Sequence, residues 1–145
     1  MNSLRSALNQ RVVIADGAMG TMLQAQNPSL EDFQNHEGCN EILNITRPDI
    51  VRAVHAEYLD AGVDAIETNT FGTNFANLAE YGIENRIYEL AFAGAKIARE
   101  AADEYSTKEN GSLSSAPSTS IKCAISLTEE SLVANIQISL EMSCS

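Results

Sequence analysis

The order of apolar and polar positions along the chain predicts two buried strands. The first is a continuous apolar run at residues 11–15 (RVVIA), which leads into the glycine-containing sequence DGAMGT. The second begins at Val63 (VDAIETNTF) and leads into a polar exit loop. Strands inside a parallel sheet are covered on both faces and are therefore apolar on both, which is the pattern of these two runs.

A helical pattern separates the two strands. We expect Thr46 to cap this helix, Pro48 to lie in its first turn and Gly62 to end it in a left-handed conformation. Residues 22–44, which precede the helix, have mixed polarity and predict a short helix and a loop. The expected buried face of the helix consists of Ile50, Val54, Tyr58 and Ala61.

A longer helical pattern covers residues 74–105, and Gly82 is expected to break it. The order of strand, helix, strand and helix predicts a right-handed crossover and a parallel sheet. Two such units do not close a barrel, and 145 residues fall short of the about 250 that a (β/α)8 barrel needs. The predicted fold class is therefore α/β and incomplete. One face of the long helix should carry Ile87, Leu90, Ala91, Gly94, Ile97 and Ala98.

The composition changes near Ser106. Residues 1–105 contain three serines, whereas the last forty residues contain eleven. Residues 107–145 show no long period and predict a linker or a poorly ordered tail, although residues 136–140 keep some strand-like apolar positions. We therefore expect one partial domain at residues 1–106 and a serine-rich tail at residues 107–145.

The charge balance narrows the choice of partners. The net charge is −11, and such an excess repels nucleic acid and anionic membranes, so neither is an expected partner. No apolar run approaches the roughly 18 residues that indicate a membrane span. The first residues, MNSLRSALNQ, lack the apolar core of a secretory signal. The expected location is the cytoplasm.

The cysteines and histidines form no recognisable metal-site pattern. Cys39, Cys123 and Cys144 are an odd number of cysteines at wide spacing, which is neither a disulfide framework nor a paired metal-binding motif. We expect reduced thiols, as in a protein of the cytosol. His36 and His55 are isolated in the sequence and are expected to be surface or packing residues.

The candidate chemistry lies where the two predicted strands end, because the carboxyl ends of parallel strands gather functional groups. At the first end, Asp16 offers a carboxylate for a ligand ammonium group, and Gly17 lets the backbone approach a small ligand. At the second end, Thr68, Asn69 and Thr70 offer hydroxyl and amide groups. Two plainer interpretations stay open, in which the aspartate shapes a turn and the Thr-Asn-Thr sequence only satisfies loop backbone groups.

Three sequences in the chain carry a family resemblance. They are DGAMGTMLQ, then GCNEILNITRPDIVRAVHAEYLDAGVDAIETNTFGTN, and then a helix that contains ENR. With their spacing, which covers about residues 11–105, they resemble the N-terminal homocysteine-binding module of cobalamin-dependent methionine synthases, in the homocysteine S-methyltransferase family. The resemblance implies the first βα units of a (β/α)8 TIM barrel. It also implies methyl transfer from methylcobalamin to homocysteine, which gives methionine.

The resemblance further implies a division of roles. Asp16 and Gly17 would hold the amino-acid end of homocysteine, and the loop with Thr68, Asn69 and Thr70 would line the same pocket. In the family, zinc ionises the homocysteine thiol, because the thiolate is the nucleophile. The three zinc-binding cysteines of the family include a Cys-Cys pair, which is absent from this sequence. We therefore assign neither zinc ligands nor a catalytic residue.

Three hypotheses follow from these observations. The first is a truncated family member that does not turn over homocysteine by itself. The second is a non-catalytic fragment that binds a partner or itself through apolar faces that two βα units leave uncovered. The third is a small independent α/β domain, for which the tail would have to supply at least one further strand.

Overall fold

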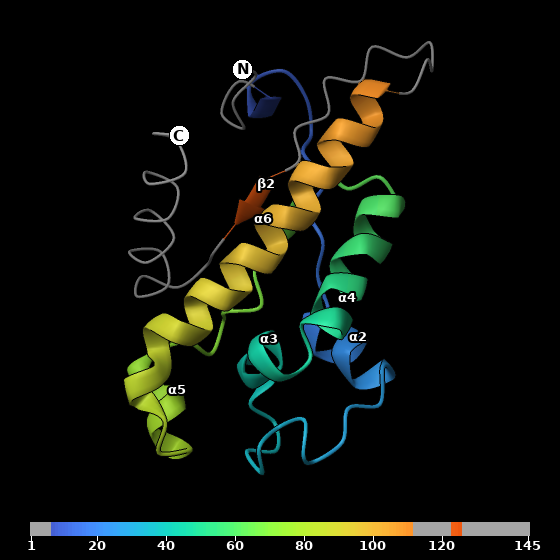
Figure 1. Cartoon of the computed structure of the whole chain (residues 1–145). Coiled ribbons are helices and arrows are strands. Elements are labelled where there is room, and N and C mark those ends of the chain that lie inside the picture. Colours follow the sequence, from blue (N-terminus) through green and yellow to red (C-terminus); the bar gives the residue numbers. More distant parts are fainter. Residues whose placement is uncertain (1–6, 112–122, 126–145) are drawn as a thin grey trace.

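The computed structural model describes residues 7–111 and 123–125, which form a mixed arrangement of helices and short strands (Figure 1). No closed barrel forms within this part of the chain. The elements in chain order are α2 (Met19–Ala25), the 3-10 helix η1 (Asn40–Ile42), α3 (Leu43–Thr46), α4 (Pro48–Asp60), β1 (Ala65–Glu67), α5 (Phe75–Glu80), the 3-10 helix η2 (Glu84–Arg86), α6 (Ile87–Gly111) and β2 (Cys123–Ile125).

The sheet is parallel, as the sequence predicts. β1 pairs with β2 in a register that places Ala65 opposite Cys123. The first predicted strand, residues 11–15, is reduced to a parallel bridge between Ala15 and Ala65. The amide of Asp64 donates to the carbonyl of Ile14 at 2.8 Å and extends this contact. The sheet order therefore places β1 between the first strand segment and β2.

The expected burial of the first strand on both faces is wrong for two of its apolar residues. Val12 is 82% exposed and Ile14 is 58% exposed. β1 lies along one edge of this stretch, and the rest of the described chain leaves these two side chains uncovered. An apolar run indicates that a strand is suited to burial, but whether it is buried depends on the elements that pack on it.

An ion pair fixes the first strand segment beside β1. The guanidinium group of Arg11 donates to both carboxylate oxygens of Asp64, at 2.7 Å each. The same carboxylate accepts the amide of Ile14 at 3.0 Å. A two-pronged contact of this kind constrains orientation as well as distance, so it defines how the segment lies along the sheet.

Helix α4 begins and ends close to the predicted positions. Pro48 occupies its first turn, and Gly62 adopts a φ of 93° just beyond its end. The predicted cap is wrong: Arg47 is the N-cap residue, and Thr46 belongs to α3. The hydroxyl of Thr46 donates to the carbonyl of Asp32 at 2.6 Å instead. The reason is that a second short helix precedes α4 directly, so the polar side chain serves the preceding loop.

The buried face of α4 is broader than the predicted stripe. Ile50 and Val54 are buried as expected, but Tyr58 is only partly buried and Ala61 is exposed. The helix packs against both α2 and α6, so a second row of its residues is also covered. One core cluster joins these layers and consists of Leu23, Phe33, Leu43, Ile50, Val51, Val54 and Ile97.

The long helical pattern is broken at Gly82, as predicted. Gly82 has a φ of 69° and separates α5 from η2 and α6. The side chain of Asn74 caps α5 by accepting the amide of Asn77 at 3.0 Å. α6 then runs beside α4 and across the strands (Figure 1). Small residues on its inner face allow this close packing, with a cluster of Leu59, Val63, Ile66, Ala98 and Ala101.

Two elements extend beyond the boundary that was expected near residue 106. Helix α6 continues to Gly111, and residues 123–125 of the predicted tail form β2 beside β1. Residues 136–140, which keep some strand-like apolar positions, lie outside the described residues. β2 extends the parallel order of the sheet. β2 is only three residues long, and such a short strand could not be recognised within a serine-rich stretch.

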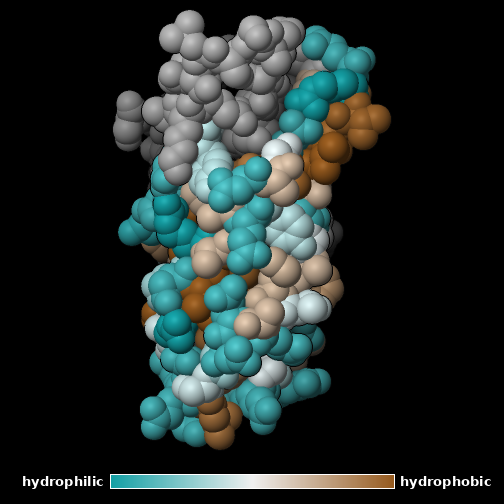
Figure 2. All heavy atoms as spheres, turned by 90° about the vertical axis from the view of Figure 1, so that its right-hand side faces the viewer, coloured by the Kyte–Doolittle hydropathy of each residue, from teal (hydrophilic) through white to brown (hydrophobic). Residues whose placement is uncertain are grey.

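The surface carries scattered apolar residues. On the face shown in Figure 2, hydrophobic residues lie in separate groups within a mainly hydrophilic surface. None of the helices in the described ranges combines the length and apolar character required to cross a membrane. The exposed large hydrophobic residues include Leu8, Val12, Ile14, Leu30, Phe71, Phe75, Tyr88 and Phe92.

Candidate functional site

A hydrogen bond joins the two strand ends that the sequence singles out. The carboxylate of Asp16 accepts the backbone amide of Glu67 at 2.7 Å, directly before Thr68. The amide of Asp16 donates to the carbonyl of Ala65 at 3.1 Å. Asp16 therefore stands at the end of the first strand segment and faces the start of the second loop. The structure brings these two predicted regions together.

The Asp16 carboxyl group has an unusually high pKa. Burial raises its pKa to about 6, the amide of Glu67 partly opposes this by stabilising the charge, and the negative charge of Glu67 adds to the increase. Asp16 is therefore mostly ionised at neutral pH but is poorly solvated. A ligand cation next to it would replace missing solvation and favour the charged form.

The turn after Asp16 has an open side. Gly17 is exposed, and a β-carbon placed on it would meet no atom within 4 Å. Ala18 adopts a φ of 50° and is the N-cap residue of α2, so the DGAMGT sequence combines a turn with a helix start. Gly20 lies within that helix, where a β-carbon would be 3.2 Å from the side chain of Asn40. Gly17 thus leaves room for a ligand, whereas Gly20 serves packing.

The second strand end forms a compact, buried loop. The hydroxyl oxygens of Thr68 and Thr70 are 2.6 Å apart and share a hydrogen bond. The hydroxyl of Thr73 donates to the carbonyl of Thr70 at 2.5 Å, and the amide of Thr70 donates to the carbonyl of Thr68 at 2.8 Å. Thr68 is 8% exposed and Thr70 only 1% exposed. The threonines therefore satisfy groups within the loop itself.

The Asn69 side chain contacts the residues that support the loop. Its amide group donates to the side-chain oxygen of Asn44 and to the carbonyl of Asn40, both at 2.9 Å. Asn44 in turn donates to the carbonyl of Asn69 at 2.8 Å and to that of Leu90 at 3.2 Å. These contacts match the plainer interpretation, in which the Thr-Asn-Thr sequence satisfies loop groups.

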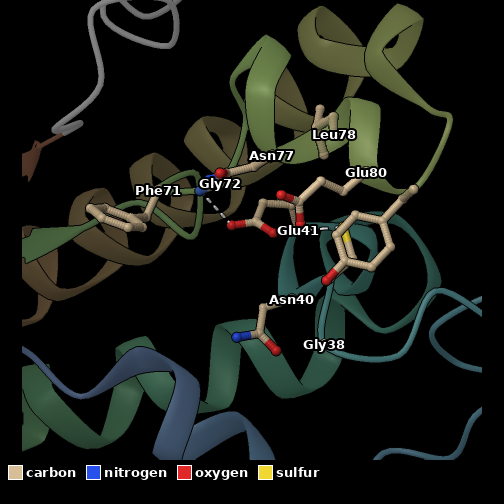
Figure 3. A pocket seen from close by; sticks show the side chains of 10 residues that line it. Gly38, Asn40, Glu41, Phe71, Gly72, Asn77, Leu78 and Glu80 are labelled. Atoms are coloured by element: carbon tan, nitrogen blue, oxygen red, sulfur yellow. Dashed lines mark hydrogen bonds between the residues drawn. The ribbon is translucent and has the colours of Figure 1, made fainter.

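A buried carboxylate, Glu41, contacts the far end of the same loop. It accepts the amide of Gly72 at 2.7 Å and the thiol of Cys39 at 3.7 Å (Figure 3). A pocket of about 290 Å³ opens beside this contact. None of the five predicted site residues lines it. Its lining consists of Gly38, Cys39, Asn40, Glu41, Phe71, Gly72, Asn77, Leu78, Glu80 and Tyr81.

Sequence reasoning missed the roles of the supporting residues Glu41, Asn44 and Gly94. Glu41 and Asn44 flank two fully buried residues within a stretch of mixed polarity, and polar residues in such a place are usually assigned to the surface. Gly94 carried a clearer signal, because an isolated glycine inside a helical pattern indicates close packing. A β-carbon there would lie 2.7 Å from the side chain of Asn44.

The described residues do not fit a zinc ion. No three histidine, cysteine or acidic side chains gather in a metal-binding group within this part of the chain. Burial and the neighbouring Glu41 raise the pKa of the Cys39 thiol to about 11, which disfavours the thiolate that zinc requires. Cys144 and the side chain of Cys123 lie outside the described residues.

Comparison with known families defines the class of protein. Parallel strands with intervening helices and polar strand ends are typical of α/β proteins that bind small molecules. The family model described as Homocysteine S-methyltransferase matches residues 13–142. The chain therefore belongs to the homocysteine S-methyltransferase family. The match extends past residue 106, into the segment that was expected to lie outside the resemblance.

Two curated relatives place the chain more closely. It is 55% identical over 101 residues to a methionine synthase of Mycobacterium tuberculosis, which covers 70% of this chain and 8% of that protein. It is 50% identical over 107 residues to a methionine synthase of Mycobacterium leprae, with 74% of this chain and 9% of that protein covered. The chain thus spans less than a tenth of the length of these relatives.

A solved structure shares the fold. The metallated form of the homocysteine methyltransferase MmuM from Escherichia coli superposes with a TM-score of 0.63 at 22% sequence identity. The comparison covers 90% of this chain and 43% of that one. At this identity the likeness concerns the arrangement of strands and helices and not the function.

Proposed function

We propose that this chain supplies the amino-acid-binding part of a homocysteine S-methyltransferase of the methionine synthase type. In this proposal the described residues are the first βα units of a TIM barrel. Asp16 holds the ammonium group of homocysteine, and the open backbone at Gly17 approaches the amino-acid end. The loop of Thr68, Asn69 and Thr70 forms the adjoining wall.

The position of Asp16 is the observation that carries this proposal. Its carboxylate is partly buried at a strand end, and one oxygen accepts a hydrogen bond from the amide of Glu67. Ionising such a group costs free energy unless a cation neutralises it. An ammonium group that binds there gains a charge-assisted hydrogen bond, and the open side at Gly17 gives it access.

The methyl transfer itself would need groups that the described residues do not provide. In the proposed family reaction, the methyl group would come from methylcobalamin and the thiol would be ionised on zinc. Because the described residues do not fit zinc, we derive no step through it. Within the described part of the chain, the residues bind and orient the amino-acid end only. We therefore expect no turnover of homocysteine by the 145-residue chain alone.

Calorimetry with the purified 145-residue chain tests this proposal. We expect no stoichiometric zinc and weak, zinc-independent binding of L-homocysteine at pH 7.5. One charge-assisted contact and a few backbone hydrogen bonds give a Kd on the order of millimolar. Absence of binding at homocysteine concentrations well above this expected Kd would overturn the substrate role. Stoichiometric zinc with methionine formation would instead show that the chain builds its own metal site.

Self-association is a second candidate function, favoured by the exposed strand segment. Val12 and Ile14 project apolar side chains beside a sheet edge, although their sequence is typical of a covered strand. Sheet edges of this kind pair readily with other chains. We expect light scattering to show dimers or larger species whose fraction rises with concentration. In Val12→Lys this association should weaken, whereas a compact monomer in the parent chain would rule the role out.

A further inference from the structure

One short segment of the chain supports the whole second strand-end loop. Two side chains of residues 40–46 contact the loop of residues 68–73. Asn44 exchanges hydrogen bonds with both the side chain and the carbonyl of Asn69. Glu41 holds the amide of Gly72. Two residues that lie close to each other in the sequence, Asn44 and Glu41, therefore hold the loop near its start and near its end.

Steric contacts define the loop position as strictly as the hydrogen bonds do. A β-carbon on Gly72 would lie 2.6 Å from a carboxylate oxygen of Glu41. A β-carbon on Gly94 of α6 would lie 2.8 Å from the methyl group of Thr70 and 2.7 Å from Asn44. None of these three distances would be tolerated without a shift of atoms. The loop thus fits closely between α6 and residues 40–46.

We propose that Asn44 and Glu41 are positioning residues for the homocysteine site. They hold the Thr68–Thr70 wall at a fixed place opposite Asp16, and they touch no substrate themselves. This inference rests on the proposed function, because it concerns the same strand-end site. It adds a cause for the conformation of the wall, which the loop residues alone do not supply.

Burial makes these contacts strong and specific. Asn44 is 3% exposed and Glu41 is 8% exposed. A buried polar group that loses its partner carries a desolvation cost, so the loop has little to gain from leaving these side chains. The hydroxyl of Thr46, in the same segment, contacts Asp32 and Ile42 and makes no hydrogen bond to the loop. Thr46 therefore provides a matched control.

Amide hydrogen exchange on the full 145-residue chain tests the positioning role directly. Glu41→Ala and Asn44→Asp should increase exchange at residues 68–73 about tenfold or more, because each leaves loop groups unpaired. Glu41→Gln keeps an oxygen for the Gly72 amide and should restore exchange near the parent rate. Thr46→Val should leave the loop protected relative to the rest of the chain.

Homocysteine calorimetry on the same variants separates positioning from general stability. We expect about tenfold weaker binding in Glu41→Ala, recovery in Glu41→Gln, and an unchanged pH midpoint of binding, because Asp16 remains in place. Uniform acceleration of exchange, or no rescue by glutamine, would overturn the positioning role. If the parent chain binds no homocysteine, the proposed function fails, and loop-selective exchange still decides whether these side chains fix the loop.

Discussion

When His55 is replaced with leucine, the loss of stability between pH 7.5 and pH 5.0 is expected to be about 2 kcal/mol smaller than in the parent chain. His55 is fully buried on α4, and its two ring nitrogens have no hydrogen-bond partner in the described structure. Burial lowers the pKa of His55 to about 4, and the positive charge of Arg52 contributes in the same direction. The imidazole is therefore neutral in the folded chain at neutral pH.

The direction of this effect follows from proton binding. Because the folded pKa is below the unfolded value of 6.5, the unfolded chain binds more protons between pH 6.5 and pH 4. The contribution is fully present above pH 6.5 and is lost as the pH falls toward 4. Leucine has a similar volume and no titrating group. It also removes two unsatisfied polar atoms, so stability at pH 7.5 should rise as well.

Urea unfolding of the parent and His55→Leu chains at several pH values measures this effect. His36→Leu is the matched control, because His36 is only partly buried and contacts the ring of Tyr81. We expect the acid-induced loss of stability to shrink in His55→Leu far more than in the control. An equal change in both variants would contradict the role assigned to the buried imidazole.

The strands and helices near the site were predictable because their apolar patterns are local. The sequence indicated the parallel order, Pro48 in the first turn of α4 and the break at Gly82, and the structure confirms each. The cap at Thr46 was wrong because the neighbouring α3 was not recognised. Burial of Val12 was wrong because it depends on elements that the local pattern does not contain.

The site was predictable only in part for a related reason. Asp16 and Thr68 follow apolar runs, so the sequence could place them at strand ends, and the structure joins Asp16 to Glu67, directly before Thr68. Whether they bind a substrate stays a prediction. The partners of Asn69 come from residues 40–44, and Asn44 in turn donates to the carbonyl of Leu90 in α6; both lie far from Asn69 in the sequence. No local pattern gives such contacts, because they arise from the packing of separate helices.

Asp16→Asn is expected to stabilise the chain while it weakens homocysteine binding. Burial raises the pKa of Asp16 to about 6, above its ordinary value of 3.8. The associated stability is therefore present below pH 3.8 and is lost as the pH rises through 6. Asparagine keeps an oxygen for the Glu67 amide and carries no charge. After allowance for partial exposure, we expect about 1–2 kcal/mol of added stability at pH 7.5.

The same substitution should reduce homocysteine affinity about tenfold or more, because a charge-assisted hydrogen bond to the ammonium group is lost. Binding by the parent chain should also weaken below pH 6, as Asp16 becomes protonated, whereas residual binding by the variant should not follow this titration. Urea unfolding and calorimetry at pH 5.0 and pH 7.5 measure both effects.

Asp64→Asn is the matched control for Asp16→Asn, since it removes a nearby carboxylate that pairs with Arg11 and should destabilise the chain. The two substitutions should therefore move the free energy of unfolding in opposite directions. A carboxylate that lowers stability is retained most readily where its charge binds a ligand. Loss of stability in Asp16→Asn with unchanged affinity would assign Asp16 to the turn alone.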